Sequence, residues 1–265
     1  MSDLAPACLA ATVGMLAVMT GAWLTQRAAG NAGWTDVFWT FGSGAALALT
    51  ALWTAEAANP ARQILAAALA VAWALRLGAA LAVRVARSPE DARYRRLRQT
   101  WAGDFQRRLL AFALKQAPAT GLLSISVFVA AHAGGPELGF RDAAGAVILL
   151  AAIAGEGLAD EQMRRFKARS EHGQIMQAGL WAWSRHPNYF FEWLAWLAWP
   201  TIAFDPAAPV TALTWLAPAL MFVILRYGTG VPMLEASMLA SRGAAFRQYQ
   251  ARVSAFFPLP PKPQE

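Results

Sequence analysis

Long apolar stretches separated by short polar connections make up most of the chain. A helix needs roughly 20 mostly apolar residues to cross the hydrocarbon core of a bilayer. The stretches that meet this requirement are Ala7–Thr25, Trp34–Thr54, Gln63–Val83, Leu109–Ala133, Ala143–Ala159, Gly179–Ala203 and Val210–Tyr227. The pattern therefore predicts an all-α integral membrane bundle of about seven transmembrane helices.

Positive charge lies in alternate connections of this predicted bundle. Arginines are frequent between the third and fourth stretches, between the fifth and sixth, and after the seventh, whereas the other connections are short and nearly uncharged. Because basic loops stay on the cytoplasmic side, the N-terminus is expected outside and the C-terminus in the cytoplasm. The mixed pattern of Pro232–Tyr249 predicts a further, cytoplasmic C-terminal helix that lies against the bundle.

Composition supports a membrane protein and argues against several other classes. Of the 265 residues, 57% are hydrophobic and only 15% are charged. The net charge of +7 comes from arginines between apolar stretches, so we expect no nucleic-acid partner. Cys8 is the only cysteine, which excludes an intrachain disulfide and a cysteine-based zinc site. No phosphate-binding glycine motif follows a strand pattern, so a nucleotide would be held by the helices themselves.

Several ionisable side chains interrupt the apolar stretches, and such groups are functional candidates because burying charge in a bilayer is costly. Some have a simple structural alternative: Asp36 could pair with Arg76, and Glu156 could pair with a nearby arginine. The candidates are Asp36, Arg76, Lys115, Glu156, Asp160 and Glu192.

The densest polar cluster lies in Gly179–Glu192 and leads directly into an apolar helix. Pro187 marks the helix start, and Asn188, Glu192 and Trp196 then follow at i, i+4 and i+8, on one face. A basic helix start with Arg185 and His186 in front favours an anionic ligand such as a phosphate. The alternative is an anchor for lipid headgroups.

Three other clusters fall at the same predicted cytoplasmic end. One is Ser88–Tyr94, which could also be an ordinary solvated loop, and another is Asp160–Lys167. In the last, Glu235, Arg242 and Tyr249 are spaced by seven residues, which keeps them near one helix face. This convergence predicts one binding site for a large, polar, phosphorylated ligand.

Together these segments resemble the steroid 5-alpha-reductase-like membrane proteins, in their large bacterial branch, which is distantly related to isoprenylcysteine methyltransferases. The run Gly179-Leu180-Trp181, then Ser184-Arg185-His186-Pro187-Asn188-Tyr189-Phe190 and Glu192, is similar to the family signature. Weaker matches are Asp36 with Trp39, Trp73 with Arg76, Glu90-Asp91 with Arg93-Tyr94, Asp160 with Gln162, and the tail from Gly230 to Pro258.

The resemblance implies one membrane-embedded domain over residues 1–265, in a bacterial inner membrane. It implies an enzyme that uses NADPH to reduce the C=C bond of a lipophilic enone, such as a 3-oxo-Δ4 steroid, that enters from the bilayer. The acid that stabilises the enolate oxygen would be Asp36, Tyr94 or Glu56. The cofactor-binding residues would be Arg93, Tyr94, Asp160, Lys167, Arg185, His186, Asn188, Glu192, Trp196, Glu235, Arg242 and Tyr249.

Two alternatives remain open from the sequence. The isoprenylcysteine-type methyltransferases, which use S-adenosylmethionine, share the Arg-His-Pro-x-Tyr run, but they usually carry two adjacent glutamates where this chain has Leu234 and Glu235. The other alternative is a non-catalytic lipid- or sterol-binding membrane protein. Ligand binding discriminates between these two alternatives and the reductase: the reductase is expected to bind NADPH and the methyltransferase S-adenosylmethionine.

Overall fold

The computed structural model describes residues 2–53, 59–135, 137–170 and 173–263. Within these residues the chain is helical and contains no strand, which confirms the predicted all-α class. The chain divides into two compact units, one formed by residues 1–146 and 198–217 and the other by residues 147–197 and 218–265. We call them unit 1 and unit 2 and describe each by itself.

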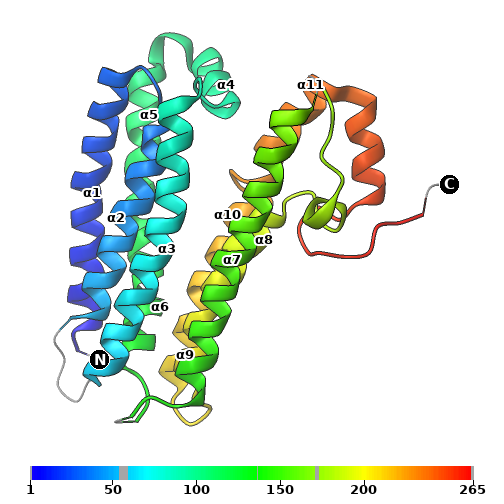
Figure 1. Ribbon diagram of the computed structural model, residues 1–265. Coiled ribbons are helices and arrows are strands. Elements are labelled where there is room, and N and C mark those ends of the chain that lie inside the picture. The colour runs from blue at the N-terminus through cyan, green and yellow to red at the C-terminus, as the bar shows by residue number, and fades with distance from the viewer. Residues whose placement is uncertain (1, 54–58, 136, 171–172, 264–265) are drawn as a thin grey trace. The chain divides into compact units, whose positions relative to one another are not determined.

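Unit 1 contains a bundle in which α1, α2, α3 and α6 run side by side (Figure 1). The helices of this unit are α1 (Leu4–Ala29), α2 (Trp34–Ala51), α3 (Pro60–Arg87), α4 (Ala92–Trp101), α5 (Phe105–Leu114), α6 (Gln116–His132), the start of α7 (Phe140–Arg169), and α9 (Ala198–Ala203). Short 3₁₀ turns lie at Ala102–Asp104 and Pro209–Trp215.

Local sequence signals set the ends of these helices. Asn59 caps α3 by accepting hydrogen bonds from the backbone N–H groups of Ala61 and Arg62, and Pro60 occupies the first helical position. Asp91 caps α4 by accepting from the N–H of Arg93 at 2.8 Å. Helix α1 ends at Gly30, whose φ of 68° is the left-handed conformation that glycine adopts without strain.

Small residues bring the bundle helices close together. A Cβ atom on Gly44 of α2 would lie 2.1 Å from the Cβ of Ala74 in α3, and one on Gly121 of α6 would lie 2.1 Å from Thr12 Oγ1 in α1. Such close contacts are typical of helices that pack inside a bilayer. Leu9, Leu49 and Ile64 are more than 60% exposed, as expected of side chains that face lipid rather than water.

Unit 2 is built from the remainder of α7, α8 (Pro187–Trp196), α10 (Leu216–Tyr227) and α11 (Val231–Arg252), with a 3₁₀ turn at Gly179–Ala182. Helix α7 packs on α8 at Gly155, where a Cβ atom would lie 2.4 Å from the ring of Phe191. An aromatic cluster of Phe190, Trp193, Phe222, Phe256 and Phe257 joins α8, α10 and the segment after α11.

The segment after α11 is tied to the turn before α8. Ser184 Oγ donates to the carbonyl of Phe256 at 2.8 Å, and the N–H of Leu259 donates to the carbonyl of Trp183 at 3.0 Å. The N–H of Arg185 donates to the carbonyl of Ser254 at 2.8 Å. Three bonds therefore hold residues 183–185 against a segment about 70 positions later in the chain.

Five helical runs among the described residues are long and apolar enough to cross a membrane: α1, α3, Ala92–His132, α7 and Pro209–Arg252. Each of the seven predicted stretches contains helix among its described residues, but α2, which carries Asp36 in its first turn, is not one of the five runs. Thr54, the predicted end of the second stretch, lies outside the described residues. The sixth stretch is divided between α8 and the six-residue α9. The chain is thus a helical membrane protein with at least these five candidate spans.

Candidate functional site

The first group of predicted residues to come together is Asp36, Arg93 and Tyr94 in unit 1. Tyr94 Oη donates to Asp36 Oδ1 at 2.6 Å, and Arg93 Nη2 donates to Asp36 Oδ2 at 3.1 Å. Tyr94 is 3% exposed. The short turn between α3 and α4 makes this contact possible, because Asp91 caps α4 and also pairs with Arg93 at 3.1 Å. Asp36 therefore has Arg93 and Tyr94 as partners, whereas the sequence suggested Arg76.

The turn that carries these residues is itself held by charge. Glu90 accepts from the N–H of Ala32 at 2.9 Å and from Arg98 Nη2 at 2.9 Å. Burial alone would raise the pKa of Glu90, but the hydrogen bonds from Arg98 and Ala32 lower it overall below the usual value of a glutamate. The pKa of Asp91 is likewise lowered, because Arg93 outweighs the effect of burial. Both carboxylates are therefore charged at neutral pH and fix the start of α4.

Glu56, the remaining predicted acid, lies outside the described residues. The candidate acid of unit 1 is therefore the hydrogen-bonded pair of Asp36 and Tyr94. A phenol in an apolar, buried setting is a suitable donor to a developing oxyanion. The carboxylate of Asp36 orients the hydroxyl, and Arg93 orients the carboxylate.

In unit 2, Arg185, His186 and Glu235 form a second predicted group. Arg185 Nε donates to Glu235 Oε1 at 2.7 Å, and His186 Nε2 lies 3.0 Å from the same oxygen. Gln250 Nε2 donates to Glu235 Oε2 at 2.7 Å. Arg185 Nη1 also donates to the carbonyls of Gln250 and Val253. Arg185 thus has internal partners that tie α11 to the turn before α8.

His186 keeps one ring nitrogen without a partner among the described residues. The side chain is only 4% exposed, and its Nδ1 atom is buried and makes no hydrogen bond there. A neutral imidazole carries one ring proton, on either Nε2 or Nδ1. With the proton on Nε2 facing the carboxylate, Nδ1 is an acceptor. A buried acceptor without a donor is costly unless a ligand or water supplies one.

The predicted face of α8 is present in the structure. Glu192 is 5% exposed and accepts from Trp196 Nε1 at 3.1 Å, one turn later. Asn188 Nδ2 lies 3.5 Å from Asp160 Oδ1 of α7, which is long for a hydrogen bond. The spacing therefore predicted correctly that Asn188, Glu192 and Trp196 share a face of one helix, and Asn188 faces α7.

The expectation that Glu235, Arg242 and Tyr249 lie along one helix face is wrong. Gly243 has φ 52° and ψ −119°, which interrupts the helical conformation of α11 between Arg242 and Tyr249. Tyr249 is buried and its hydroxyl donates to the carbonyl of Trp181. Arg242 donates to the carbonyl of Gln174 at 3.3 Å. The three side chains therefore make separate sets of contacts. Lys167 is exposed near the end of α7.

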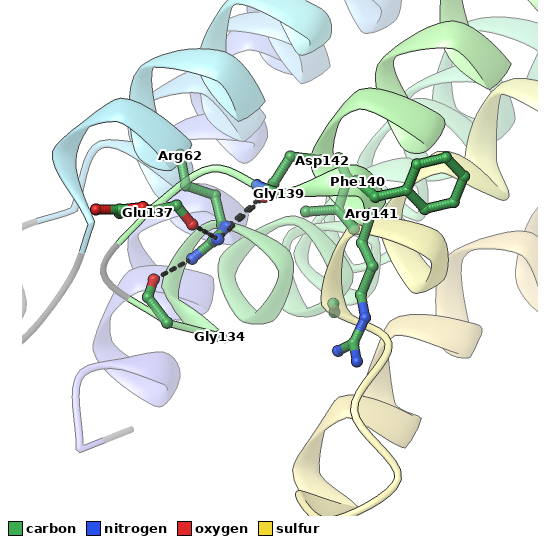
Figure 2. Close-up of a pocket in the computed structure, with 10 residues that line it drawn as sticks. Arg62, Gly134, Glu137, Gly139, Phe140, Arg141 and Asp142 are labelled. Carbon is green, nitrogen blue, oxygen red and sulfur yellow. Dashed lines mark hydrogen bonds and ion pairs between the residues drawn. The ribbon is translucent and has the colours of Figure 1, made fainter.

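Sequence reasoning missed a buried ion pair in unit 1, between Arg62 of α3 and Asp142 of α7 (Figure 2). The residues are 5% and 3% exposed. Arg62 Nε donates to Asp142 Oδ1 at 2.7 Å and Nη2 donates to Oδ2 at 3.0 Å. The remaining donors bind the carbonyls of Ala133, Gly135 and Glu137 at 2.8–3.0 Å. Each residue is the third of its helix, and charged residues are common near a helix start. The sequence pattern therefore did not indicate that these two residues are buried or paired.

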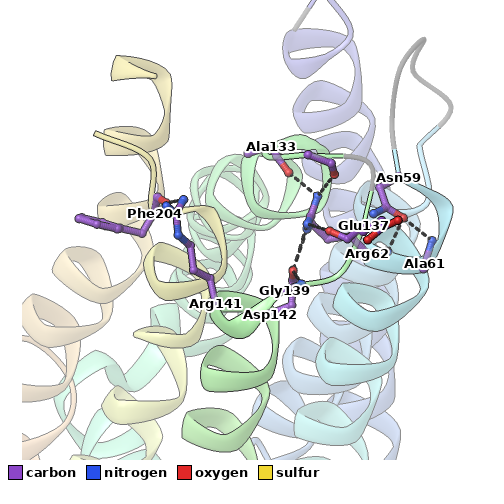
Figure 3. Close-up of polar contacts among 10 residues, drawn as sticks. Asn59, Ala61, Arg62, Ala133, Glu137, Gly139, Arg141, Asp142 and Phe204 are labelled. Atoms are coloured by element: carbon purple, nitrogen blue, oxygen red, sulfur yellow. Dashed lines mark hydrogen bonds and ion pairs between the residues drawn. The ribbon is translucent and has the colours of Figure 1, made fainter. Parts of the chain in front are cut away.

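A cavity of about 310 Å³ lies beside this ion pair. Arg141, which also lines it, turns away from Arg62 and donates to the carbonyl of Phe204 (Figure 3). All five N–H donors of Arg62 are already used. The pair therefore joins α3, α7 and the loop between α6 and α7, and its role is structural.

In the described part of the chain, no group of His, Cys, Asp and Glu side chains could hold a metal ion.

Comparison with known proteins gives one match. A family model described as protein of unknown function (DUF1295) matches residues 22–253, which include every candidate site residue named above. No curated protein and no solved structure matches the chain.

Proposed function

The chain belongs to the DUF1295 family, a membrane-protein family linked to steroid 5-alpha-reductase-like proteins, and we propose that it reduces the C=C bond of a lipophilic enone with NADPH. A 3-oxo-Δ4 steroid is the model substrate. The observation that most supports the proposal is the buried polar network of unit 2, in which His186 Nδ1 is left as an acceptor. The fold does not satisfy this atom, so a ligand with hydrogen-bond donors suits it.

In this proposal the chain crosses a bacterial inner membrane seven times. The crossings are the five apolar runs, together with α2 and the stretch formed by α8 and α9. An odd number of crossings puts the two termini on opposite sides of the membrane, and the arginine distribution then puts the N-terminus outside and the C-terminus in the cytoplasm. The lipophilic substrate then reaches the protein from the bilayer.

The donor set of unit 2 fits a dinucleotide. Lys167 and Arg242 supply cationic groups for phosphates, whereas Asn188, Glu192 and His186 supply uncharged and acceptor groups for hydroxyls and amides. NADPH, when bound, supplies the hydride that the β-carbon of the enone accepts. The internal contacts of Arg185, Glu235 and Tyr249 give these three residues a positioning role.

The acid in this proposal is the Tyr94–Asp36 pair of unit 1. Tyr94 Oη would donate its hydrogen bond to the carbonyl oxygen of the enone, on which negative charge develops during the reduction. Asp36 accepts the Tyr94 hydrogen bond at rest, and Arg93 fixes Asp36 through its other oxygen. The α-carbon is then protonated from water, which completes the addition of one hydride and one proton.

Thermal unfolding of the purified protein in detergent tests the proposal. NADPH at 100 times its dissociation constant is expected to stabilise the folded state by about 2.7 kcal/mol, whereas NADH and S-adenosylmethionine are expected to stabilise it less. Stabilisation by S-adenosylmethionine alone would identify a methyltransferase instead. If none of the three nucleotides stabilises the protein, the non-catalytic lipid-binding alternative gains support.

Replacing Asn188 or Glu192 by alanine is expected to weaken NADPH binding at least about tenfold, because each substitution removes a polar group from the α8 face. Isothermal titration of the purified variants measures the change. Leu194→Ala is the matched control, since Leu194 lies on the opposite side of the same helix. Wild-type affinity in both polar variants would exclude this face from the cofactor site.

A further inference from the structure

One end of unit 1 carries an unusually basic surface. At this end α1 and α3 finish, and α4 and α5 follow in a short connected pair (Figure 1). Trp23 Nε1 of α1 donates to the carbonyl of Gln106 in α5 at 2.9 Å, and Asn31 donates to the carbonyl of Val85 in α3 at 3.3 Å, which brings these segments together. The exposed arginines of this end, which we call the basic face, are Arg27, Arg84, Arg87, Arg95, Arg96, Arg107 and Arg108.

The charge of the basic face is only partly balanced within the described protein, where Arg84 helps to lower the pKa of Asp91 and Arg95 helps to lower the pKa of Glu90. The nearby carboxylates Asp36, Glu90 and Asp91 pair with Arg93 and Arg98, which are not part of the face. Asp104 lies 3.8 Å from Arg108, at the limit of an ion pair. The other six arginines make no ion pair with a described carboxylate. A surface with this excess of positive charge attracts anions from solution or from a membrane.

Arg95 donates to the carbonyl of Glu90 and Arg27 lies over the ring of Trp23, but none of these arginines is part of the apolar core. The opposite side of α4 and α5 is apolar, and there Tyr94, Phe105 and Leu109 are buried with Leu97 and Trp101 packed against them. The two helices are therefore amphipathic, with an apolar side on the bundle and arginines outside. Amphipathic helices with arginine on the polar side are typical of segments that lie at a membrane surface.

The other end of unit 1 has a different charge balance. There Arg62 is buried in its ion pair with Asp142, and Arg141 is the one further arginine or lysine among the described residues. Asp3, Glu137 and Asp205 add negative charge at that end. Because α1 and α3 are long and apolar enough to span a bilayer, the two ends of unit 1 lie near opposite membrane surfaces. The arginines of the basic face therefore lie near only one of the two leaflets.

We propose that the basic face binds the headgroups of anionic phospholipids. The arginines lie where the candidate span α3 ends and the candidate span Ala92–His132 begins, so they would meet lipid phosphates at this end without a change in the fold. Juxtamembrane basic clusters bind anionic leaflets through this attraction, which falls off within a Debye length of about 10 Å in 0.1 M salt. This interaction is independent of the proposed reductase activity.

The test is a titration of the purified protein in detergent with phosphatidylglycerol or phosphatidylcholine, followed by the midpoint of thermal unfolding. Phosphatidylglycerol is expected to stabilise the wild type at lower concentrations than phosphatidylcholine, and 1 M NaCl is expected to remove this preference. Equal stabilisation by both lipids, or a preference that survives 1 M NaCl, would overturn the proposal whatever the variants do.

Variants locate the effect. R87Q/R96Q/R107Q is expected to need at least about tenfold more phosphatidylglycerol for half-maximal stabilisation, because three unpaired charges are lost. R87K/R96K/R107K keeps the charge and is expected to retain the preference. The matched control is R169Q/R247Q/K262Q, which removes three exposed basic residues from unit 2 that make no ion pair with a described carboxylate. An equal loss in the control variant would show that net charge, and not the basic face, binds the lipid.

Discussion

Asp142→Asn is expected to lower the free energy of unfolding by about 3–5 kcal/mol, the largest loss we expect from one substitution. The variant leaves the guanidinium of Arg62 buried without its counter-charge, since Arg62 and Asp142 are both nearly inaccessible. Asp142 also accepts from the N–H of Gly139 at 2.8 Å, so the start of α7 loses a further bond. Chemical unfolding of the purified protein in detergent measures the difference.

Two further variants separate the causes of that loss. Glu137→Gln is the matched control, because Arg62 binds the backbone carbonyl of Glu137 and not its side chain, and it is expected to change stability by less than about 0.5 kcal/mol. R62M/D142L removes both charges and is expected to be more stable than Asp142→Asn, although three carbonyls lose their donor. A loss below about 1 kcal/mol in Asp142→Asn would show that the pair is solvated.

Tyr94→Phe and Asp36→Asn are each expected to lower turnover by about 10²- to 10⁴-fold, while the affinity for NADPH changes little. The prediction rests on the proposed reductase activity. Phenylalanine removes the proton donor, and asparagine removes the carboxylate that orients it at 2.6 Å. Single-turnover oxidation of NADPH by a lipophilic enone, followed by absorbance, measures the chemical step.

The matched control for this pair is Tyr227→Phe, which removes the same hydroxyl from an exposed side chain of α10. Turnover of this control is expected to equal that of the wild type. A large loss in Asp36→Asn with wild-type turnover in Tyr94→Phe would assign the proton to Asp36 alone. Unchanged rates in both variants would remove the pair from the reaction and leave Glu56 as the remaining acid candidate.

Hydrophobic length predicted most of the helical architecture, because a bilayer demands the same apolar length from every crossing segment. It predicted α2 as a helix although the charged Asp36 lies in its first turn. The face of α8 followed from simple 3.6-residue spacing, since Pro187 starts a regular helix and nothing interrupts it before Trp196.

The sequence was less informative where a contact depends on tertiary structure. Arg62 and Asp142 are 80 positions apart, and no local pattern pairs two charges over that distance. The seven-residue spacing of Glu235, Arg242 and Tyr249 failed for a local reason, because Gly243 adopts a positive φ inside α11. A glycine within a mixed helical pattern was the available warning. The preference of Asp36 for Arg93 and Tyr94 depends on the turn before α4, which spacing does not reveal.

The bonds between residues 183–185 and the segment after α11 also set an order of events during synthesis. The segment that starts α8 is made well before Ser254, Phe256 and Leu259, the residues that hold it in place. Until those later residues leave the ribosome, Ser184 and Arg185 lack their partners, and the neighbouring His186 is not yet held. The polar network of unit 2 is therefore completed only after α8, α10 and α11 have been made, so a nascent chain that stops at α11 lacks a formed site.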